Sequence, residues 1–142
     1  MIFIEKAHGE AIRSHGQQEY PYECCGVLLG KIDSEGRKTV KLALPISNAR
    51  DEAEKHNRFT ITPEEMLRCE LKAQREGLEV LGFYHSHPDH PAEPSAYDRE
   101  NAWPFYSYVI VSVRNGKARE LKSWELRADR KKFNEECITE GD

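Results

Sequence analysis

Residues 83–98 read FYHSHPDHPAEPSAYD and place three histidines and two aspartates within sixteen positions. Polar side chains of this kind are seldom buried unless each one finds a partner. The stretch therefore predicts a metal site, a capped helix terminus or a polar loop, and the residues around it decide between these three.

His85 and His87 alternate at the end of an apolar run, VLGFY at residues 80–84. Such a run is typical of a buried strand. Residues at i and i+2 of a strand leave the same face, about 6.5–7 Å apart at the backbone. That span suits two imidazole nitrogens that bind one ion at about 2.0–2.1 Å each. The pattern favours a metal site at the carboxyl end of this strand.

A catalytic zinc site takes three protein ligands and leaves one position for water. Asp98 and His90 are the candidates nearest in sequence for the third ligand. Simpler interpretations exist: the two alternating histidines can be structural, Ser95 and Asp98 fit a helix capping box, and His90 can be a solvated loop residue. These would all have to hold at once beside an apolar strand, so the metal site is favoured.

The chain has 142 residues, of which 38% are hydrophobic and 32% are charged, and its net charge is −4. This composition predicts a soluble globular protein with a single domain over residues 1–142. The sequence has no basic patch, which makes nucleic acid and anionic membranes poor partners. It also has no run near the ~20 apolar residues that a membrane helix needs.

The four cysteines, at positions 24, 25, 69 and 137, form no C-x-x-C pair. Adjacent cysteines on an extended segment point to opposite faces, which is a poor start for a zinc knuckle. The first residues lack the features of a signal peptide. We therefore expect reduced thiols and a cytoplasmic protein.

Hydrophobic periodicity and turn residues predict a mixed α+β chain. We expect strands at residues 1–4, 26–30, 37–46 and 78–87, and at 106–114 and 117–126 around an Asn-Gly turn. We expect helices at residues 5–15, 62–77 and 127–138, and a short one from 95 that Pro104 limits. Residues 47–58 are polar and are expected to form an exposed loop.

Three local predictions are specific enough to check. Gly16 is expected to end the first helix. Thr62 is expected to cap the helix at 62–77, with Pro63 at its first position and Glu65 completing a capping box. The apolar residues of strand 37–46, which are Val40, Leu42 and Leu44, are expected on one face.

His-Ser-His-Pro at 85–88, followed after ten residues from His87 by the Asp98 of a Ser-x-x-Asp motif, resembles the JAMM (MPN-plus, Mov34/PAD1-like) metalloprotease family. Glu23 before a Cys-Gly-strand segment, RFTITPEEM at 58–66 and SYVIVSV at 107–113 extend the resemblance over most of the chain. It implies a three-layer α/β/α sandwich around a mixed, mainly antiparallel, cytidine-deaminase-like sheet. Only 44 residues follow Asp98, so the chain resembles the compact prokaryotic members.

The resemblance also implies roles for individual residues. His85, His87 and Asp98 would bind Zn²⁺, Glu23 would act as general base on the bound water, and Ser95 would donate a hydrogen bond to the oxyanion. The implied reaction is hydrolysis of the peptide or isopeptide bond after the C-terminal Gly-Gly of a ubiquitin-like, sulfur-carrier-type protein. The sequence leaves open whether the chain forms a homodimer, which carrier it uses and whether zinc is its metal.

The alternative function is a non-catalytic MPN-type interaction module that binds ubiquitin-like proteins, and retention of every motif residue argues against it. A zinc deaminase would need H-x-E and P-C-x-x-C, which the sequence lacks. A cysteine protease would need a low-pKa thiolate, whereas Cys25 begins a strand expected to be buried. His56 and Arg58 are open as substrate contacts, and His90 as a spacer or a lip of the substrate site.

Overall fold

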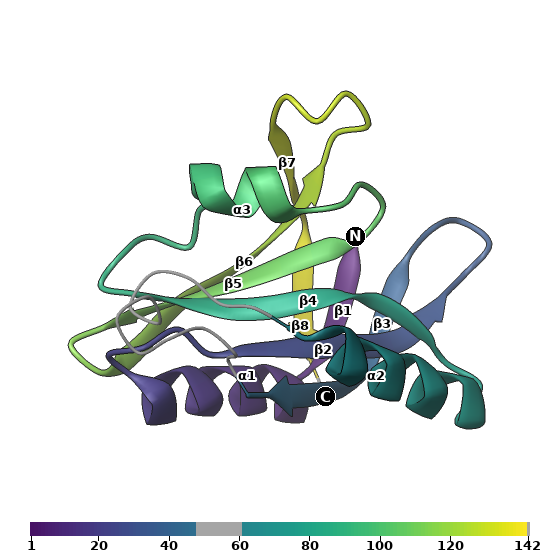
Figure 1. Ribbon diagram of the computed structural model, residues 1–142, viewed down its shortest axis with the longest axis horizontal. Helices are drawn as coiled ribbons and strands as arrows, with labels where there is room; N and C mark the ends of the chain where they lie inside the picture. Colours follow the sequence, from purple (N-terminus) through teal and green to yellow (C-terminus); the bar gives the residue numbers. More distant parts are fainter. Residues whose placement is uncertain (48–60, 142) are drawn as a thin grey trace.

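The computed structural model describes residues 1–47 and 61–141, and in this part eight strands and three helices follow one another (Figure 1). The strands are β1 (Ile2–Glu5), β2 (Cys25–Ile32), β3 (Lys38–Ile46), β4 (Glu79–Pro88), β5 (Ser107–Arg114), β6 (Lys117–Leu126), β7 (Phe133–Glu136) and β8 (Ile138–Gly141). The helices are α1 (Lys6–Glu19), α2 (Pro63–Arg75) and α3 (Ala96–Asn101). The expected loop at 47–58 lies, apart from Ser47, outside the described residues, and so do His56 and Arg58.

All eight strands belong to one sheet, in the order β7-β6-β5-β4-β2-β3-β1-β8. The pairs β1–β3, β1–β8 and β4–β5 are parallel. The remaining four pairs are antiparallel. The expected mixed, mainly antiparallel sheet is therefore confirmed.

Alternate residues of β2 pack into two separate cores. Leu28 joins a cluster with Ile12 of α1. Val27 joins a cluster with Cys69 and Ala73 of α2. Because neighbouring residues of a strand point to opposite faces, α1 and α2 cover opposite sides of the sheet. This is the three-layer arrangement that the family resemblance implies.

A β-bulge in β3 corrects the prediction for its apolar residues. The register with β2 passes directly from Leu42 to Val40 and leaves Lys41 as an extra residue. As a result Val40 lies in the cluster on the α1 side, whereas Leu42 and Leu44 pack on the α2 side. The extra residue of a bulge turns the following side chains to the other face, and simple alternation of apolar residues cannot reveal it.

The helix expected at 127–138 is wrong, because the structure has the short strands β7 and β8 there. These strands stand at the two ends of the sheet order, and Cys137 alone separates them. The sheet is therefore curled so that one continuous segment, yellow in Figure 1, pairs with β6 and then with β1. Helix propensity is a weak prior, and here pairing with two open strand edges overrides it.

The first helix continues through Gly16 to Glu19, so Gly16 does not end it. A Cβ atom at Gly16 would lie 3.0 Å from Val113 Cγ2 and 3.3 Å from Val111 Cγ1. The glycine instead allows α1 to approach β5 closely.

The other local predictions hold in part. Thr62 Oγ1 accepts a hydrogen bond from the Glu65 N–H (3.2 Å). The Glu65 side chain pairs with Arg68, so only one half of the capping box is seen. Asn115 and Gly116 both have positive φ (51° and 79°), as a two-residue type I′ hairpin requires.

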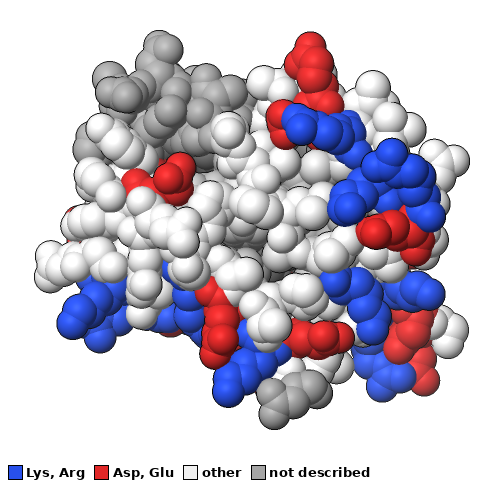
Figure 2. Space-filling model, turned by 90° about the horizontal axis from the view of Figure 1, so that it is seen from below, with Lys and Arg blue, Asp and Glu red and all other residues white. Residues whose placement is uncertain are grey.

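The described surface mixes charges of both signs. On the face shown in Figure 2, lysine and arginine side chains are interspersed with aspartate and glutamate around a largely uncharged centre. Among the described helices, none is long and apolar enough to span a lipid bilayer.

Candidate metal centre

His85 and His87 lie on β4 with their imidazole rings on the same side of the sheet. Both are buried, with exposed fractions of 1% and 7%. Their Nε2 atoms are 3.1 Å apart. The alternation in sequence thus becomes a pair of ring nitrogens that point at one place.

Asp98 comes to the same place from the first turn of α3. Its Oδ2 atom lies 3.3 Å from His85 Nε2 and 3.2 Å from His87 Nε2. The same oxygen accepts a hydrogen bond from the Ser95 N–H (2.9 Å), while Ser95 Oγ accepts one from the Asp98 N–H (3.1 Å). Ser95 and Asp98 form the capping box, and the box itself holds the carboxylate against the histidines. Capping and metal binding therefore do not compete for these side chains.

We call His85, His87 and Asp98 the His–Asp cluster; its ligand atoms could hold a metal ion. The three atoms are 3.1–3.3 Å apart. A tetrahedral ion with bonds of about 2.0–2.1 Å has ligand atoms about 3.3–3.4 Å apart. The donor set therefore fits a small divalent ion without large rearrangement.

A hydrogen bond on the side of the ring away from the cluster fixes the orientation of His87. Its Nδ1 lies 2.8 Å from the Pro91 carbonyl oxygen. A carbonyl only accepts hydrogen bonds, so Nδ1 carries the proton and the Nε2 lone pair is left for an ion. Burial alone would raise the pKa of Asp98, but the imidazoles of His85 and His87 together hold this pKa well below its usual value. The carboxylate is thus kept as an anion.

Glu23 reaches the cluster through the register of β2 and β4. Cys25 pairs with His85, so two residues back along this antiparallel ladder Glu23 comes opposite His87 and on the same face. Its side chain is buried, with an exposed fraction of 4%. Burial raises the pKa of Glu23 to about 8, with a smaller opposing effect of His87. A buried carboxyl with such a pKa beside a candidate metal site has the character of an acid–base group.

Two further contacts tie the segment that carries Glu23 to the end of β4 that carries His87. On the far face, Ser86 Oγ accepts a hydrogen bond from the Cys24 N–H (2.8 Å). At the rim, the Tyr20 hydroxyl donates to Asp89 Oδ2 (2.6 Å). Asp89 Oδ1 also accepts from the Asn115 N–H (2.9 Å). The sequence analysis missed Tyr20 and Asp89, which are far apart in the chain and belong to no motif.

The sequence leaves open whether His90 is the third metal ligand and whether Cys25 is a nucleophile. The positions of these two residues in the structure argue against both. The grouping of potential ligands contains Asp98 and not His90, which is exposed. Cys25 is fully buried, and burial raises the pKa of its thiol. A thiol of this kind is a poor nucleophile, which argues against a cysteine protease.

The family model described as prokaryotic homologues of the JAB domain matches residues 5–127. The chain is 42% identical to a desampylase of Haloferax volcanii over 72% of this chain and 74% of that protein. It is 30% identical to a probable TtuB-protein conjugate cleaving protease of Thermus thermophilus, over 80% of this chain and 71% of that one. It is 31% identical to a CysO-cysteine peptidase of Mycobacterium bovis, over 82% and 76% of the two chains.

Solved structures agree with these similarities. The solution structure of a protein from Desulfitobacterium hafniense superposes with a TM-score of 0.85 at 33% identity, over 99% of this chain and 92% of that one. A JAB1/MPN domain protein from Archaeoglobus fulgidus gives a TM-score of 0.61 at 17% identity, over 100% and 98% of the two chains. The second likeness concerns the fold alone.

Proposed function

The chain belongs to the family of prokaryotic homologues of the JAB domain, and from this premise we propose that it is a zinc-dependent peptidase. We propose that it hydrolyses the peptide or isopeptide bond after the C-terminal Gly-Gly of a ubiquitin-like, sulfur-carrier-type protein. Relatives named for cleaving TtuB-protein conjugates and CysO-cysteine support this substrate class. The observation that carries the proposal is the convergence of His85, His87 and Asp98 beside the buried carboxyl of Glu23.

In this proposal the His–Asp cluster would hold zinc, with the two imidazoles and the Asp98 carboxylate as its ligands. Zinc, when bound, supplies polarisation of the scissile carbonyl and a lower pKa for the attacking water. Glu23 accepts the proton of that water and later returns it to the leaving nitrogen. The Glu23 carboxyl ionises more readily beside a bound cation, which moves its pKa from about 8 in the direction that a general base needs.

Ser95 completes the proposed site. Its hydroxyl oxygen accepts from the Asp98 N–H, so the hydroxyl proton remains available for donation. Ser95 is exposed, and a substrate carbonyl can therefore reach it. Donation to the developing oxyanion by one such group is worth about 10²–10³ in rate.

We further propose that the protein works in a reducing compartment, the cytoplasm. All four cysteines are free thiols, and three of them are buried. Free thiols of this kind persist where disulfides are kept reduced.

The test uses a sulfur-carrier protein fused after its Gly-Gly to a short peptide. We expect cleavage directly after Gly-Gly, loss of cleavage on dialysis against a chelator, and recovery when zinc is returned. Glu23→Gln is expected to keep its zinc and to lower the rate by about 10²–10⁴. Glu19→Gln, a carboxylate at the end of α1, is the matched control and should cleave normally.

A non-catalytic module would give a different result in the same experiment. It would bind the carrier but leave every fusion intact, with or without zinc. That outcome, or equal cleavage by the wild-type and Glu23→Gln proteins, would overturn the proposed function.

A further inference from the structure

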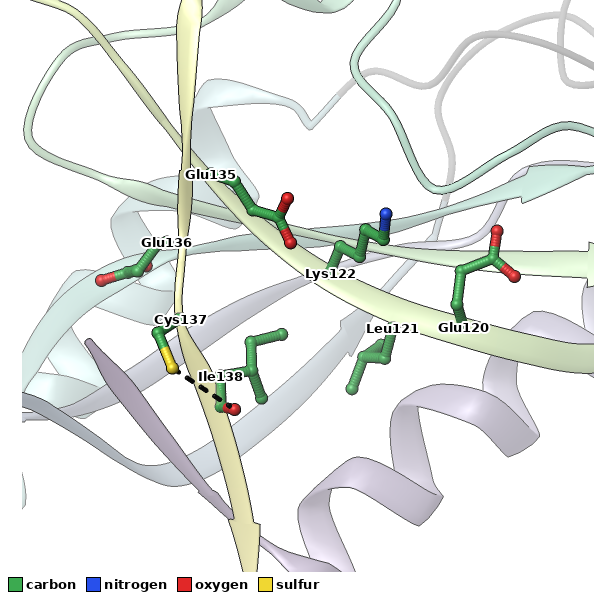
Figure 3. A pocket seen from close by; sticks show the side chains of 7 residues that line it. All are labelled: Glu120, Leu121, Lys122, Glu135, Glu136, Cys137 and Ile138. Atoms are coloured by element: carbon green, nitrogen blue, oxygen red, sulfur yellow. Dashed lines mark hydrogen bonds between the residues drawn. The ribbon is translucent and has the colours of Figure 1, made fainter.

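Of two pockets in the described part of the chain, one is lined by Ser95, which contacts the His–Asp cluster, and the other is not. The larger, of about 520 Å³, is lined by β6 and by the segment around Cys137 (Figure 3). Its lining includes Glu120, Glu135 and Glu136 but no residue of the cluster. The smaller, of about 320 Å³, lies between α3, β6 and the start of β7. We call the smaller one the α3 pocket; its lining residues are Pro94, Ser95, Ala96, Arg99, Trp124, Lys132 and Phe133.

Ser95 connects the α3 pocket to the cluster. Its side chain lines the pocket, and its N–H donates to Asp98 Oδ2 (2.9 Å). That oxygen is the one 3.2 Å from His87 Nε2. A substrate group bound in the pocket would therefore lie directly beside the reacting centre.

The charged residues of the α3 pocket are Arg99 and Lys132, and both are cations. Arg99 Nη1 donates to the Lys131 carbonyl oxygen (3.3 Å). Within residues 1–47 and 61–141 neither Arg99 nor Lys132 forms an ion pair. By contrast, Arg127 in the neighbouring loop pairs with Asp129 (3.1 Å). The pocket thus offers two cations to an external anion.

The other walls of the pocket are apolar and held in place. The Trp124 indole N–H donates to the Ala92 carbonyl oxygen (2.9 Å), which fixes the ring. Phe133 and Pro94 supply further apolar surface. A volume of about 320 Å³ is at the small end of the range for ligand pockets, about 300–1,000 Å³. The pocket therefore suits one amino acid residue and not a folded partner.

We propose that the α3 pocket binds the free α-carboxylate of a single amino acid on the leaving side of the scissile bond. This rests on the proposed function and narrows its substrate to a Gly-Gly tail extended by one residue. Arg99 follows Ser95 by four residues, which is about 6 Å along the helix axis. The carboxylate carbon of that residue is about 2.5 Å from the scissile nitrogen, within reach of a long cationic side chain.

Other bonds between the carrier and its leaving group place no free carboxylate in the α3 pocket. In an isopeptide bond the leaving nitrogen is that of a lysine side chain, whose own carboxyl is already part of a peptide bond. Each residue added to a linear extension moves the terminal carboxylate about 3.3–3.6 Å further away. Arg99 and Lys132 therefore select against isopeptide-linked lysines and against linear extensions of more than one residue.

The experiment compares three extensions of the carrier after Gly-Gly: one residue with a free carboxylate, the same residue as its amide, and an isopeptide-linked lysine. We expect kcat/KM for the free carboxylate to exceed that for the amide by about 10–100-fold, as for a hydrogen bond to a charged group. Arg99→Gln with Lys132→Gln should raise KM for the free carboxylate and bring its kcat/KM down to that for the amide. Lys131→Gln, one position outside the pocket, is the matched control.

Binding gives a second readout that does not depend on turnover. In the Glu23→Gln background, calorimetry should show tighter binding of the free-carboxylate peptide than of its amide, and the double variant should abolish the difference. Either single variant should show a smaller change in the same direction if the double variant folds poorly. Equal kcat/KM for carboxylate and amide in the wild type would overturn this inference while leaving the proposed function intact. No cleavage of any of the three would overturn both.

Discussion

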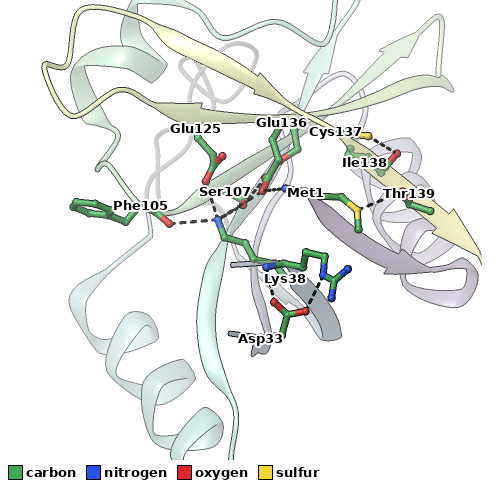
Figure 4. A network of polar contacts seen from close by, with 12 residues as sticks. Met1, Asp33, Lys38, Phe105, Ser107, Glu125, Glu136, Cys137, Ile138 and Thr139 are labelled. Carbon is green, nitrogen blue, oxygen red and sulfur yellow. Dashed lines mark hydrogen bonds and ion pairs between the residues drawn. The ribbon is translucent and has the colours of Figure 1, made fainter. Parts of the chain in front are cut away.

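Two polar clusters in the same sheet, each with buried members, differ in how their charge is balanced. The His–Asp cluster contains one carboxylate and two imidazoles, and beside it stands the buried carboxyl of Glu23. The other, which we call the Lys38 cluster, is shown in Figure 4 and carries its own cation. Its members are Met1, Lys38, Phe105, Ser107, Ser123, Glu125 and Glu136.

In the Lys38 cluster the polar groups satisfy one another. Lys38 Nζ donates to Ser107 Oγ (2.6 Å) and lies 3.2 Å from a Glu125 carboxylate oxygen. Ser107 and Ser123 both donate to Glu136 Oε1, at 2.6 and 2.8 Å. The cluster links β3 to β5, β6 and β7, and so it stabilises the curled sheet. The His–Asp cluster instead offers two imidazoles and one carboxylate, which an ion from solution can bind.

Breaking the Lys38 cluster should have the largest effect on folding. Lys38→Met keeps the volume of the side chain but leaves Glu136, 5% exposed, with less cationic compensation. Removing one partner of a buried ion pair typically costs about 3–5 kcal/mol. We expect the free energy of unfolding, measured by urea denaturation, to fall by about that amount, while zinc affinity is unchanged.

Lys41→Met is the control for this change. Lys41 is on the same strand, and its amine lies 3.8 Å from Glu5 in a pair that is about half exposed. Its loss should cost less than about 1 kcal/mol. Equal losses in the two variants would show that the Lys38 cluster does not stabilise the sheet.

Changing the His–Asp cluster should affect metal binding much more than folding. Asp98→Asn removes the one anion of the cluster, yet the amide oxygen can still accept from the Ser95 N–H. We expect zinc affinity to fall by more than about a hundredfold, because Asp98 is itself a ligand and loss of a mere supporting partner already costs about 10–100-fold. The metal-free protein should lose about 1 kcal/mol, because Asp98 is 10% exposed and contacts both histidines, and this is less than the loss expected for Lys38→Met. Competition with a zinc chelator measures the first quantity and urea denaturation the second.

Glu100→Gln, on the same helix and exposed, is the matched control and should change neither quantity. A large loss of stability in metal-free Asp98→Asn would mean that both clusters serve folding, and the contrast between them would fail.

The contact between Tyr20 and Asp89 should have a smaller effect, on rate alone. Tyr20→Phe removes the hydroxyl that donates to Asp89 (2.6 Å) and so loosens the segment of Glu23 relative to the end of β4 that carries His87. Because catalysis is sensitive to small misplacements, we expect kcat to fall about threefold to tenfold at constant KM and zinc content. Tyr106→Phe, a tyrosine whose ring packs on Phe83, serves as the control. An effect on KM instead of kcat would assign Tyr20 to substrate binding.

The smallest expected effect is the pH dependence of the stability that the pair of Arg13 and Glu140 contributes between α1 and β8. Hydrogen bonds from Arg13 to Glu140 (2.8 and 2.7 Å) lower the pKa of Glu140 below its ordinary 4.5. A carboxyl with a lowered folded pKa contributes stability above pH 4.5, and this contribution is lost as the pH falls below that value. The pair is partly exposed, so we expect less than about 1 kcal/mol. Urea unfolding of the wild type and Glu140→Gln at pH 6 and pH 3 should differ only at pH 6.

The sequence predicts the parts of the site that depend on local spacing. His85 and His87 share a face because a strand alternates, and Ser95 with Asp98 caps a helix because of its three-residue spacing. Glu23 is different, because its position depends on the register between β2 and β4. Only the family resemblance indicated it; no periodicity in the sequence encodes the pairing of Glu23 with His87, sixty-four positions further along.

The failures of prediction have a common physical origin in long-range pairing. The bulge at Lys41 changes the face of Val40, and the edges of β6 and β1 convert an expected helix into β7 and β8. Arg99 and Lys132 meet in one pocket only because the segment before β7 folds back beside α3. Each outcome depends on partners that are distant in sequence, to which local propensity is blind.

The segment at 133–141 also bears on how the protein is made. Residues 6–137 separate β1 from its partner β8 in the sequence, so β1 waits for these residues to be synthesised before this pairing can form. Until then the open edges of β1 and β6 are both available to other nascent chains. A ribosome stalled before residue 133 would therefore hold a chain with its His–Asp cluster complete in sequence but its sheet still open at two edges.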